Sequence, residues 1–434
     1  MLIAITTFAI FAPGVYFCLI RSNDASALSA NSQRLTFFFQ FIPIIFGIVA
    51  IGVFDIELWQ GLHSKISDNT RFIVTVQSIF TLYAMLFILK INHRNFKNID
   101  TVFIQKRNYR FFKVSKFVVI SLSIIILCMV FELYRIPSYP LIIALTEGPV
   151  AGAIARGEVI NYQIKNGIPL FGYILYFAPT IFLVWLMYFY YQKGVKILFW
   201  FYLGVYVLFN SIILSKSIFL VPLLLIAWVR YTVLKLKIDI LFLMLILLSI
   251  LTMFYLVAQS NLMDILENIL RRVFIGQSMG MFLIREYFTE QDMNALFYGF
   301  PLHRLFGVES FDPSALVVEK IFGAEVDGFV NINSFFVGQG FVMVGNAIII
   351  IGPLIYFLNI WMIFQISKFF KRTTSNNLQS VIVLYFVLTL PINTNFALLL
   401  YLKPVLGFVL VSLFFETCAY FSGESKLISK ADCR

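Results

Sequence analysis

Residues 336–366 read FVGQGFVMVGNAIIIIGPLIYFLNIWMIFQI, a run in which no side chain is charged. A transmembrane helix needs about 20 predominantly apolar residues, so this stretch is long enough to cross a bilayer. Similar apolar runs recur along the chain and predict about eleven spans in total, within a range of ten to twelve. The others are expected at residues 1–20, 35–54, 72–91, 117–134, 169–191, 197–213, 217–233, 239–258, 379–392 and 394–418.

The composition of the whole chain agrees with this pattern. Apolar residues make up 60% of the 434 residues and charged residues 13%, against about 45–50% and about 25% in soluble proteins. This composition excludes a water-soluble globular protein. It predicts an all-α, polytopic integral membrane protein with a single transmembrane domain over residues 1–434. The net charge of +11 would suggest nucleic-acid binding in a soluble protein, but here its distribution among the loops matters more, and we expect no nucleic-acid partner.

The sequence leaves two parts of the predicted topology to be argued separately: the last two spans and residues 1–20. Pro391, Asn393 and Asn395 interrupt the apolar run between the last two spans, so this part is either two spans or one broken helix. Residues 1–20 lack the basic n-region and small-residue cleavage site of a signal peptide, so we expect a span there.

The Lys and Arg residues predict the orientation of the spans. Alternate connections on one side of the membrane carry twenty Lys and Arg residues and four acidic ones, whereas the other side is richer in acidic residues. Cytoplasmic loops are enriched in Lys and Arg. Residues 92–116 and the C-terminus are therefore predicted to be cytoplasmic, and the N-terminus to lie outside.

Two of the predicted outer loops are long, at residues 135–168 and 259–335. The first contains several Pro and Gly residues and predicts a shaped loop with short helical pieces. In the second, apolar residues recur at helical spacing over 262–274, which predicts an amphipathic helix at the membrane surface or over the bundle. Farther on, Asp312 and Pro313 predict the start of another helix.

The first outer loop carries charges without an obvious structural role. Arg156 and Glu158 lie in a Gly- and Ala-rich stretch, and Lys165 and Gly167 follow, with ten residues between Arg156 and Gly167. A guanidinium suits a diphosphate ligand because it donates two parallel charge-assisted hydrogen bonds. Arg156 is therefore either a phosphate ligand or an ordinary loop cation.

The second outer loop carries a further set of cations. Arg271 and Arg272 either contact lipid headgroups or bind a ligand, and Arg285 either pairs with a neighbouring acid, Glu286 or Glu290, or binds a ligand. Arg304, beside Pro and Gly residues, is open to the same two interpretations as Arg156.

His303 is the one histidine of that loop. It is either an ordinary hydrogen-bonding residue or a proton carrier, since imidazole titrates near neutral pH. The outer acids that suit the same task are Glu158, Glu309, Asp312 and Asp327.

Lys216 lies in the short turn Leu214-Ser-Lys-Ser217 between two spans. A cation at the centre of a spanning helix costs about 2.5–3.5 kcal/mol, so Lys216 either snorkels to the interface or faces a phosphate at the mouth of the bundle. Trp59, Tyr139 and Tyr162 either stack on sugar rings or belong to interfacial aromatic belts. The scattered Cys and His residues show no metal spacing and no nucleotide-binding motif occurs, so we expect no metal, nucleotide or other cofactor.

The layout of ten or more spans, a medium outer loop and a larger one before the last spans resembles the Wzy-type O-antigen polymerases. The local pieces that carry the resemblance are residues 155–158 with 165–167, residues 214–217 and residues 331–345. The spacing from Arg156 to Gly167 is similar to the arginine–ten–glycine pattern of such polymerases. The second loop departs from it, because Leu283 stands where the glycine after Arg272 would be.

The resemblance implies a metal- and nucleotide-independent glycosyltransferase of the bacterial inner membrane, with both long loops periplasmic. It would polymerise oligosaccharide repeat units carried on undecaprenyl diphosphate, which is also the leaving group. A chain-length regulator and a flippase are the implied partners, besides the lipid bilayer. Because diphosphate leaves readily, the main catalytic needs are charge stabilisation and alignment.

The resemblance implies three roles for residues of the site. Diphosphate clamping falls mainly to Arg156, Lys216 and Arg304, with Arg272 and Arg285 as weaker candidates. Lys165 and Gly167 are expected to contact substrate, and Glu158 or His303 to take the hydroxyl proton.

Three other interpretations stay open. An O-antigen ligase shares the layout and the donor, and composition does not separate it from a polymerase. A lipid-linked oligosaccharide flippase would carry charges deep in its spans and short loops, whereas the charges here are expected to avoid the spans. The last interpretation is a non-catalytic assembly partner.

Overall fold

The computed structural model describes residues 32–52, 66–104, 116–168, 170–190, 195–214, 217–229, 276–298, 300, 307, 310–322, 333–370 and 376–423. Every regular element within these residues is a helix. Seven of the described helical segments are long and apolar enough to cross a membrane. They are Ser32–Gly52 (α2 Ser32–Thr36, η2 Phe37–Phe41 and α3 Ile42–Gly52), α4 (Asp68–Ile91), α6 (Lys116–Arg135), α9 (Phe171–Tyr188), α10 (Val195–Ile212), Val337–Phe370 and α21 (Lys403–Phe421).

Four of the other predicted spans have two outcomes. Two shorter helices, α11 (Ser217–Trp228) and α19 (Asn376–Leu388), occupy most of the predicted spans 217–233 and 379–392. The predicted spans 1–20 and 239–258 lie outside the described residues. The protein is therefore a polytopic membrane protein whose described part is all-helical.

Two of the apolar runs are broken rather than continuous. The run from residue 336 divides into α17 (Val337–Val344) and α18 (Ile348–Phe370), separated by the short helix η7 (Gly345–Ala347). Gly345 has φ +63°, a conformation that costs glycine nothing because it has no Cβ. The single helix predicted for 336–366 is therefore two helices.

The break between the last two predicted spans has a structural partner. After α19 the chain forms α20 (Phe396–Leu400) before α21 begins. The Phe336 and Ser334 amides donate to the carbonyls of Ile392 and Asn393 at 2.9 and 3.2 Å. The broken segment thus satisfies backbone groups at the entry to α17, as irregular backbone within a membrane protein requires.

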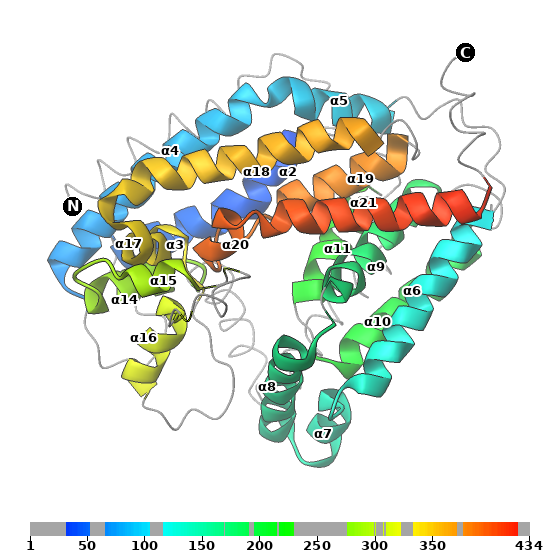
Figure 1. Cartoon of the computed structure of the whole chain (residues 1–434), viewed down its shortest axis with the longest axis horizontal. Coiled ribbons are helices and arrows are strands. Elements are labelled where there is room, and N and C mark those ends of the chain that lie inside the picture. The colour runs from blue at the N-terminus through cyan, green and yellow to red at the C-terminus, as the bar shows by residue number, and fades with distance from the viewer. Residues whose placement is uncertain are drawn as a thin grey trace.

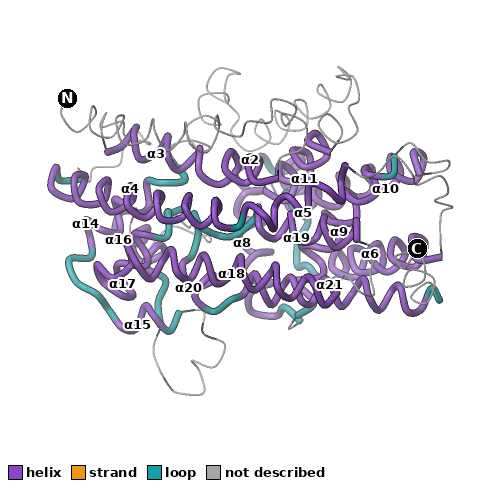
Figure 2. The backbone as a smooth tube through the Cα atoms, turned by 90° about the horizontal axis from the view of Figure 1, so that it is seen from above, coloured by secondary structure: helices purple, strands orange, loops and turns teal. Residues whose placement is uncertain are grey.

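The long helices pack side by side along the molecule (Figure 1). Helix α4 lies along α18, and α9 contacts α6, α10, α11, α19 and α21. Figure 2 shows the same α4–α18 neighbourhood from above. Large aromatic side chains fill the interior around α9, where Trp185 meets Phe117 edge to face with ring centroids 5.6 Å apart.

Residues 135–168, predicted as a shaped loop with short helical pieces, contain two helices, of which the second is long. These helices are α7 (Pro140–Thr146) and α8 (Pro149–Asn166), each with proline at its first position. They pack closely at Gly152, where a Cβ would lie 2.4 Å from the Ala144 Cβ.

Residues 259–335 contain three further described helices, α14 (Met279–Tyr287), α15 (Met293–Leu296) and α16 (Pro313–Phe322). The predicted start of α16 is confirmed, since Asp312 Oδ1 accepts a hydrogen bond from the Ser314 amide at 2.9 Å. The predicted amphipathic helix at 262–274 lies outside the described residues.

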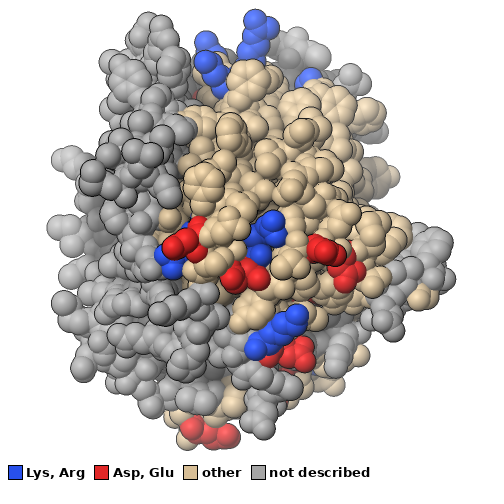
Figure 3. Space-filling view, turned by 90° about the vertical axis from the view of Figure 1, so that its left-hand side faces the viewer, with Lys and Arg blue, Asp and Glu red and all other residues tan. Residues whose placement is uncertain are grey.

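Connections predicted to share one side of the membrane lie together. At one end, helix α5 (His93–Ile104) meets the start of α2, where the Ser32 amide donates to Asp100 Oδ1 at 2.9 Å. At the other end, the Ser67 hydroxyl donates to Glu286 of α14 at 2.8 Å. Figure 3 views the end that carries α14 to α17, on which acidic and basic side chains are interspersed among uncharged ones.

Candidate functional site

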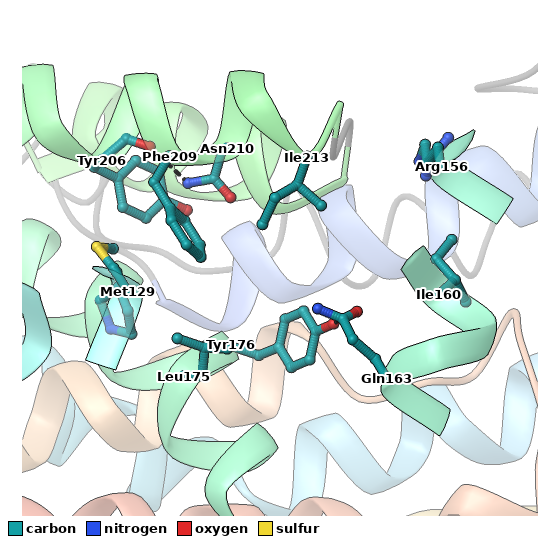
Figure 4. Close-up of a pocket in the computed structure, with 11 residues that line it drawn as sticks. Met129, Arg156, Ile160, Gln163, Leu175, Tyr176, Tyr206, Phe209, Asn210 and Ile213 are labelled. Carbon is teal, nitrogen blue, oxygen red and sulfur yellow. Dashed lines mark hydrogen bonds between the residues drawn. The ribbon is translucent and has the colours of Figure 1, made fainter. Parts of the chain in front are cut away.

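Helices α6, α8, α9 and α10 meet around a small cavity. This cavity of about 50 Å³ is lined by residues of these four helices, and Arg156 is among them. In Figure 4, Arg156, Ile160 and Gln163 come from α8 and face Tyr206 and Asn210 of α10 across it. The structure thus brings the predicted residue Arg156, which is half-buried, to a cavity wall.

A larger cleft of about 640 Å³ adjoins this cavity and shares Gln163, Leu175 and Tyr176 with it. We call it the α6–α8 cleft. Its volume falls within the range of about 300–1,000 Å³ that is usual for ligand pockets. Its charged lining residues are Glu132 and Arg135 at the end of α6 and Lys403 at the start of α21, and aromatic rings line much of the rest: Tyr162, Phe171, Tyr173, Tyr176 and Phe177.

A chain of polar contacts crosses the α6–α8 cleft. Arg135 Nη1 lies 3.5 Å from Glu132 Oε2. Gln163 Nε2 donates to Glu132 Oε1 at 2.9 Å, and the Tyr176 hydroxyl donates to Gln163 Oε1. Arg135 Nη2 also donates to the Asn166 carbonyl at 2.6 Å, so α6 and α8 are joined at both ends of this chain.

Gly167 lies at the wall of the same cleft, directly after α8. A Cβ at this position would lie 2.2 Å from the Gln163 carbonyl oxygen, a backbone atom that cannot rotate away. Only glycine therefore fits here without a shift of the helix end. Of the predicted pair, Arg156 thus lies on α8, which also carries Gln163, and Gly167 directly follows that helix.

Backbone strain occurs at two positions beside the α6–α8 cleft. Leu170 has φ 69° and Leu402 has φ 52°, and they directly precede α9 and α21. A left-handed conformation at a residue other than glycine costs roughly 1–2 kcal/mol. Such strain is concentrated at functional sites in proteins, and Lys403 follows one of the two strained residues.

Two other predicted site residues of the first loop, Glu158 and Lys165, also belong to α8. Glu158 is exposed and lines neither cavity. Lys165 lies near the end of α8, but its side chain is outside what the structure describes.

Arg285 lies in a separate group, which we call the α14–α17 cluster: Arg285, Phe341, Asp312 and Gln339. The guanidinium carbon of Arg285 is 3.5 Å from the centre of the Phe341 ring, and Nη1 donates to the Phe288 carbonyl at 3.1 Å. Burial lowers the pKa of Arg285. The neighbouring Glu286, one of its two expected partners, accepts hydrogen bonds from Ser67 instead.

Asp312 in the α14–α17 cluster also makes hydrogen bonds that hold helices together. Its Oδ1 accepts from the Ser314 amide and lies 3.4 Å from Gln339 Nε2. The fully buried Gln339 in turn accepts from the Phe396 amide at 2.9 Å. Burial raises the pKa of Asp312, and its contacts join α16 to α17 and, through Gln339, to α20.

The remaining predicted residues, Lys216, Arg272, His303 and Arg304, lie outside the described residues. Within the described part of the chain no group of three or more His, Cys, Asp or Glu side chains is arranged to hold a metal ion.

Sequence reasoning overlooked Glu132, Arg135, Gln163 and Lys403. It expected charges to avoid the spans, which was wrong, because Glu132 and Lys403 lie within the predicted spans 117–134 and 394–418. An acidic residue in an apolar run was a usable signal, since such residues are costly there and usually functional.

No protein-family model, curated protein or solved structure matches this chain.

Proposed function

We propose that the protein is a membrane glycosyltransferase that polymerises oligosaccharide repeat units carried on undecaprenyl diphosphate at the outer face of the bacterial inner membrane. The growing chain is transferred from its lipid diphosphate to a sugar hydroxyl of the next unit, and undecaprenyl diphosphate leaves. The reaction needs cations for the diphosphate, surfaces for sugar rings and access for a lipid chain.

The observation that carries the proposal is the lining of the α6–α8 cleft. Arg135 and Lys403 come from helices distant in the sequence and line one cavity, with Arg156 at the adjoining one. Two cations suit a diphosphate, and Arg offers it two parallel hydrogen bonds. The Tyr and Phe rings of the cleft are suited to stacking on sugars.

Exposed apolar side chains surround the same cleft. Ile168 and Leu170 line it and are 44% and 50% exposed, and Phe131 on the neighbouring turn of α6 is 45% exposed. A polyprenyl chain packs against such a surface. The position supports the proposal further, since the cleft lies at the end of α6 next to the predicted outer loop 135–168.

Deletion of the gene in its host, followed by gel analysis of lipopolysaccharide, tests the proposal. We expect a single repeat unit on the core and no ladder of longer chains, with the ladder restored by the intact gene. Complete loss of repeat units from the core would indicate a ligase or a flippase and overturn the proposal. Purified protein in proteoliposomes should lengthen undecaprenyl-diphosphate-linked repeat units without added metal or nucleotide.

A further inference from the structure

Glu132 is a buried carboxylate inside a membrane-spanning helix. It is 4% exposed, lies one turn before the end of α6, and lines the α6–α8 cleft. A carboxylate within a membrane span costs free energy, and such residues are found where they have polar partners or a function. Its partners are Gln163 on α8 and Arg135 on its own helix.

The contacts of Glu132 leave part of its hydrogen-bonding capacity unused. Each carboxylate oxygen offers two lone pairs. Oε1 accepts one hydrogen bond, from Gln163 at 2.9 Å, and Oε2 faces Arg135 at a loose 3.5 Å. The carboxylate is therefore held in a defined position and can still accept a proton from a group in the cleft.

We propose that Glu132 is the general base of the transfer step, an inference that rests on the proposed function. The acceptor hydroxyl oxygen forms a bond to the anomeric carbon of the donor chain while the bond from that carbon to the diphosphate oxygen breaks. The hydroxyl proton passes to Glu132, and the electron pair of the broken bond leaves on undecaprenyl diphosphate. The proton is later released to water.

Arg135 is a positioning residue that links donor binding to this step. Its guanidinium contacts Glu132 and faces the same cavity as Lys403. A donor diphosphate that accepts hydrogen bonds from Arg135 replaces Glu132 as the partner of the guanidinium. The carboxylate is then free to accept a hydrogen bond from the acceptor hydroxyl.

The other titratable groups around Glu132 come from several helices. Those that line its cleft are Arg135 on α6, Tyr162 on α8, Tyr173 and Tyr176 on α9, and Lys403 on α21. Among them Glu132 is the one carboxylate in the described lining. Substitution of this one side chain should therefore remove the base from the cleft.

The test is the substitution Glu132→Gln, which keeps the shape and an acceptor for Gln163 but removes the base. In proteoliposomes with undecaprenyl-diphosphate-linked repeat units we expect chain extension to fall by about 10²–10⁴-fold, the usual size of a general-base contribution. Donor binding, measured by competition with undecaprenyl diphosphate, should stay within about threefold.

Glu147→Gln is the matched control, because Glu147 is exposed at the end of α7 and lines neither cavity; its rate should equal that of the wild type. Glu132→Asp withdraws the carboxylate by one methylene. It should lose about 10²-fold in rate, as a misplacement near 1 Å does.

Wild-type protein that extends chains while the rate of E132Q stays within threefold of it would overturn the role of Glu132 alone. If E132Q fails to fold, an unchanged rate in E132D does the same. Wild-type protein that binds the donor without extending chains would overturn the proposed function, and this inference with it.

Discussion

Arg135 and Arg285 are both helical arginines that fall within the predicted outer loops 135–168 and 259–335, yet their surroundings differ in kind. Arg135 lines a cleft of about 640 Å³ and contacts a carboxylate loosely. Arg285 lies face to face with Phe341 and donates to a carbonyl of its own segment. A cation against a cavity can exchange its partner for a ligand, whereas a cation packed on a ring stabilises the fold.

The same contrast holds for the acidic residues. Asp312 accepts a helix-capping hydrogen bond and joins a buried network with Gln339. Glu132 is buried too, but it faces the α6–α8 cleft. The two carboxylates are therefore alike in burial and differ in their surroundings: Asp312 belongs to a helix cap, whereas Glu132 lines a cleft.

The largest effect that tests this comparison is expected for Lys403→Gln. A charge-assisted hydrogen bond is worth about 1.5–3 kcal/mol, so the affinity for undecaprenyl diphosphate should fall about 10- to 100-fold in a binding assay with purified protein. Lys320→Gln is the matched control, because Lys320 is exposed and lies over Phe288 beside the α14–α17 cluster. Equal losses in both variants would remove the distinction between the two regions.

Gly167→Ala tests whether the cleft depends on the end of α8. The new Cβ would lie 2.2 Å from the Gln163 carbonyl oxygen, and overpacking of this kind costs about 1–3 kcal/mol. We expect a lower thermal midpoint in detergent and slower chain extension, since Gln163 and the Asn166 carbonyl move together. Gly204→Ala, where no atom lies within 4 Å, should instead stabilise α10 by about 0.5–1 kcal/mol. A G167A protein as stable and active as the wild type would contradict the prediction.

The smallest effect is expected for Arg285→Met in the α14–α17 cluster. The variant loses the cation–π contact with Phe341, worth about 0.5–2 kcal/mol, and keeps a long apolar side chain. Thermal unfolding should show a modest loss of stability, with a smaller one in Arg285→Lys. Undecaprenyl diphosphate binding by the folded protein should not change, and a tenfold loss would move Arg285 into the binding site.

The membrane class and most described helices follow from local patterns. Apolar runs predicted helices that the structure contains, and Asp312-Pro313 predicted the start of α16, because span length and helix capping depend on neighbours in the chain. The two-part form of 336–366 was missed, because a glycine in an apolar run is compatible with a continuous helix and its positive φ is decided by packing.

The candidate site was anticipated only in part. Arg156 and Gly167 were predicted from their residue types and spacing, and the structure places them at the walls of adjoining cavities. Their roles stay predictions. The role of Lys403 had no local signal, since a lysine at the start of a span is ordinary. Its place opposite Arg135 depends on how α21 packs near α6 and α9.

The sequence by itself thus determined that this chain is helical and membrane-embedded, since burial of apolar side chains in lipid and internal backbone hydrogen bonding are requirements that each segment meets alone. Only the tertiary structure decided which charges share a cavity. Packing of α6, α8 and α9 brings Glu132, Gln163 and Tyr176 together, and Lys403 joins them from α21, far along the chain. The spacing of these residues in the sequence does not show that they line one cleft.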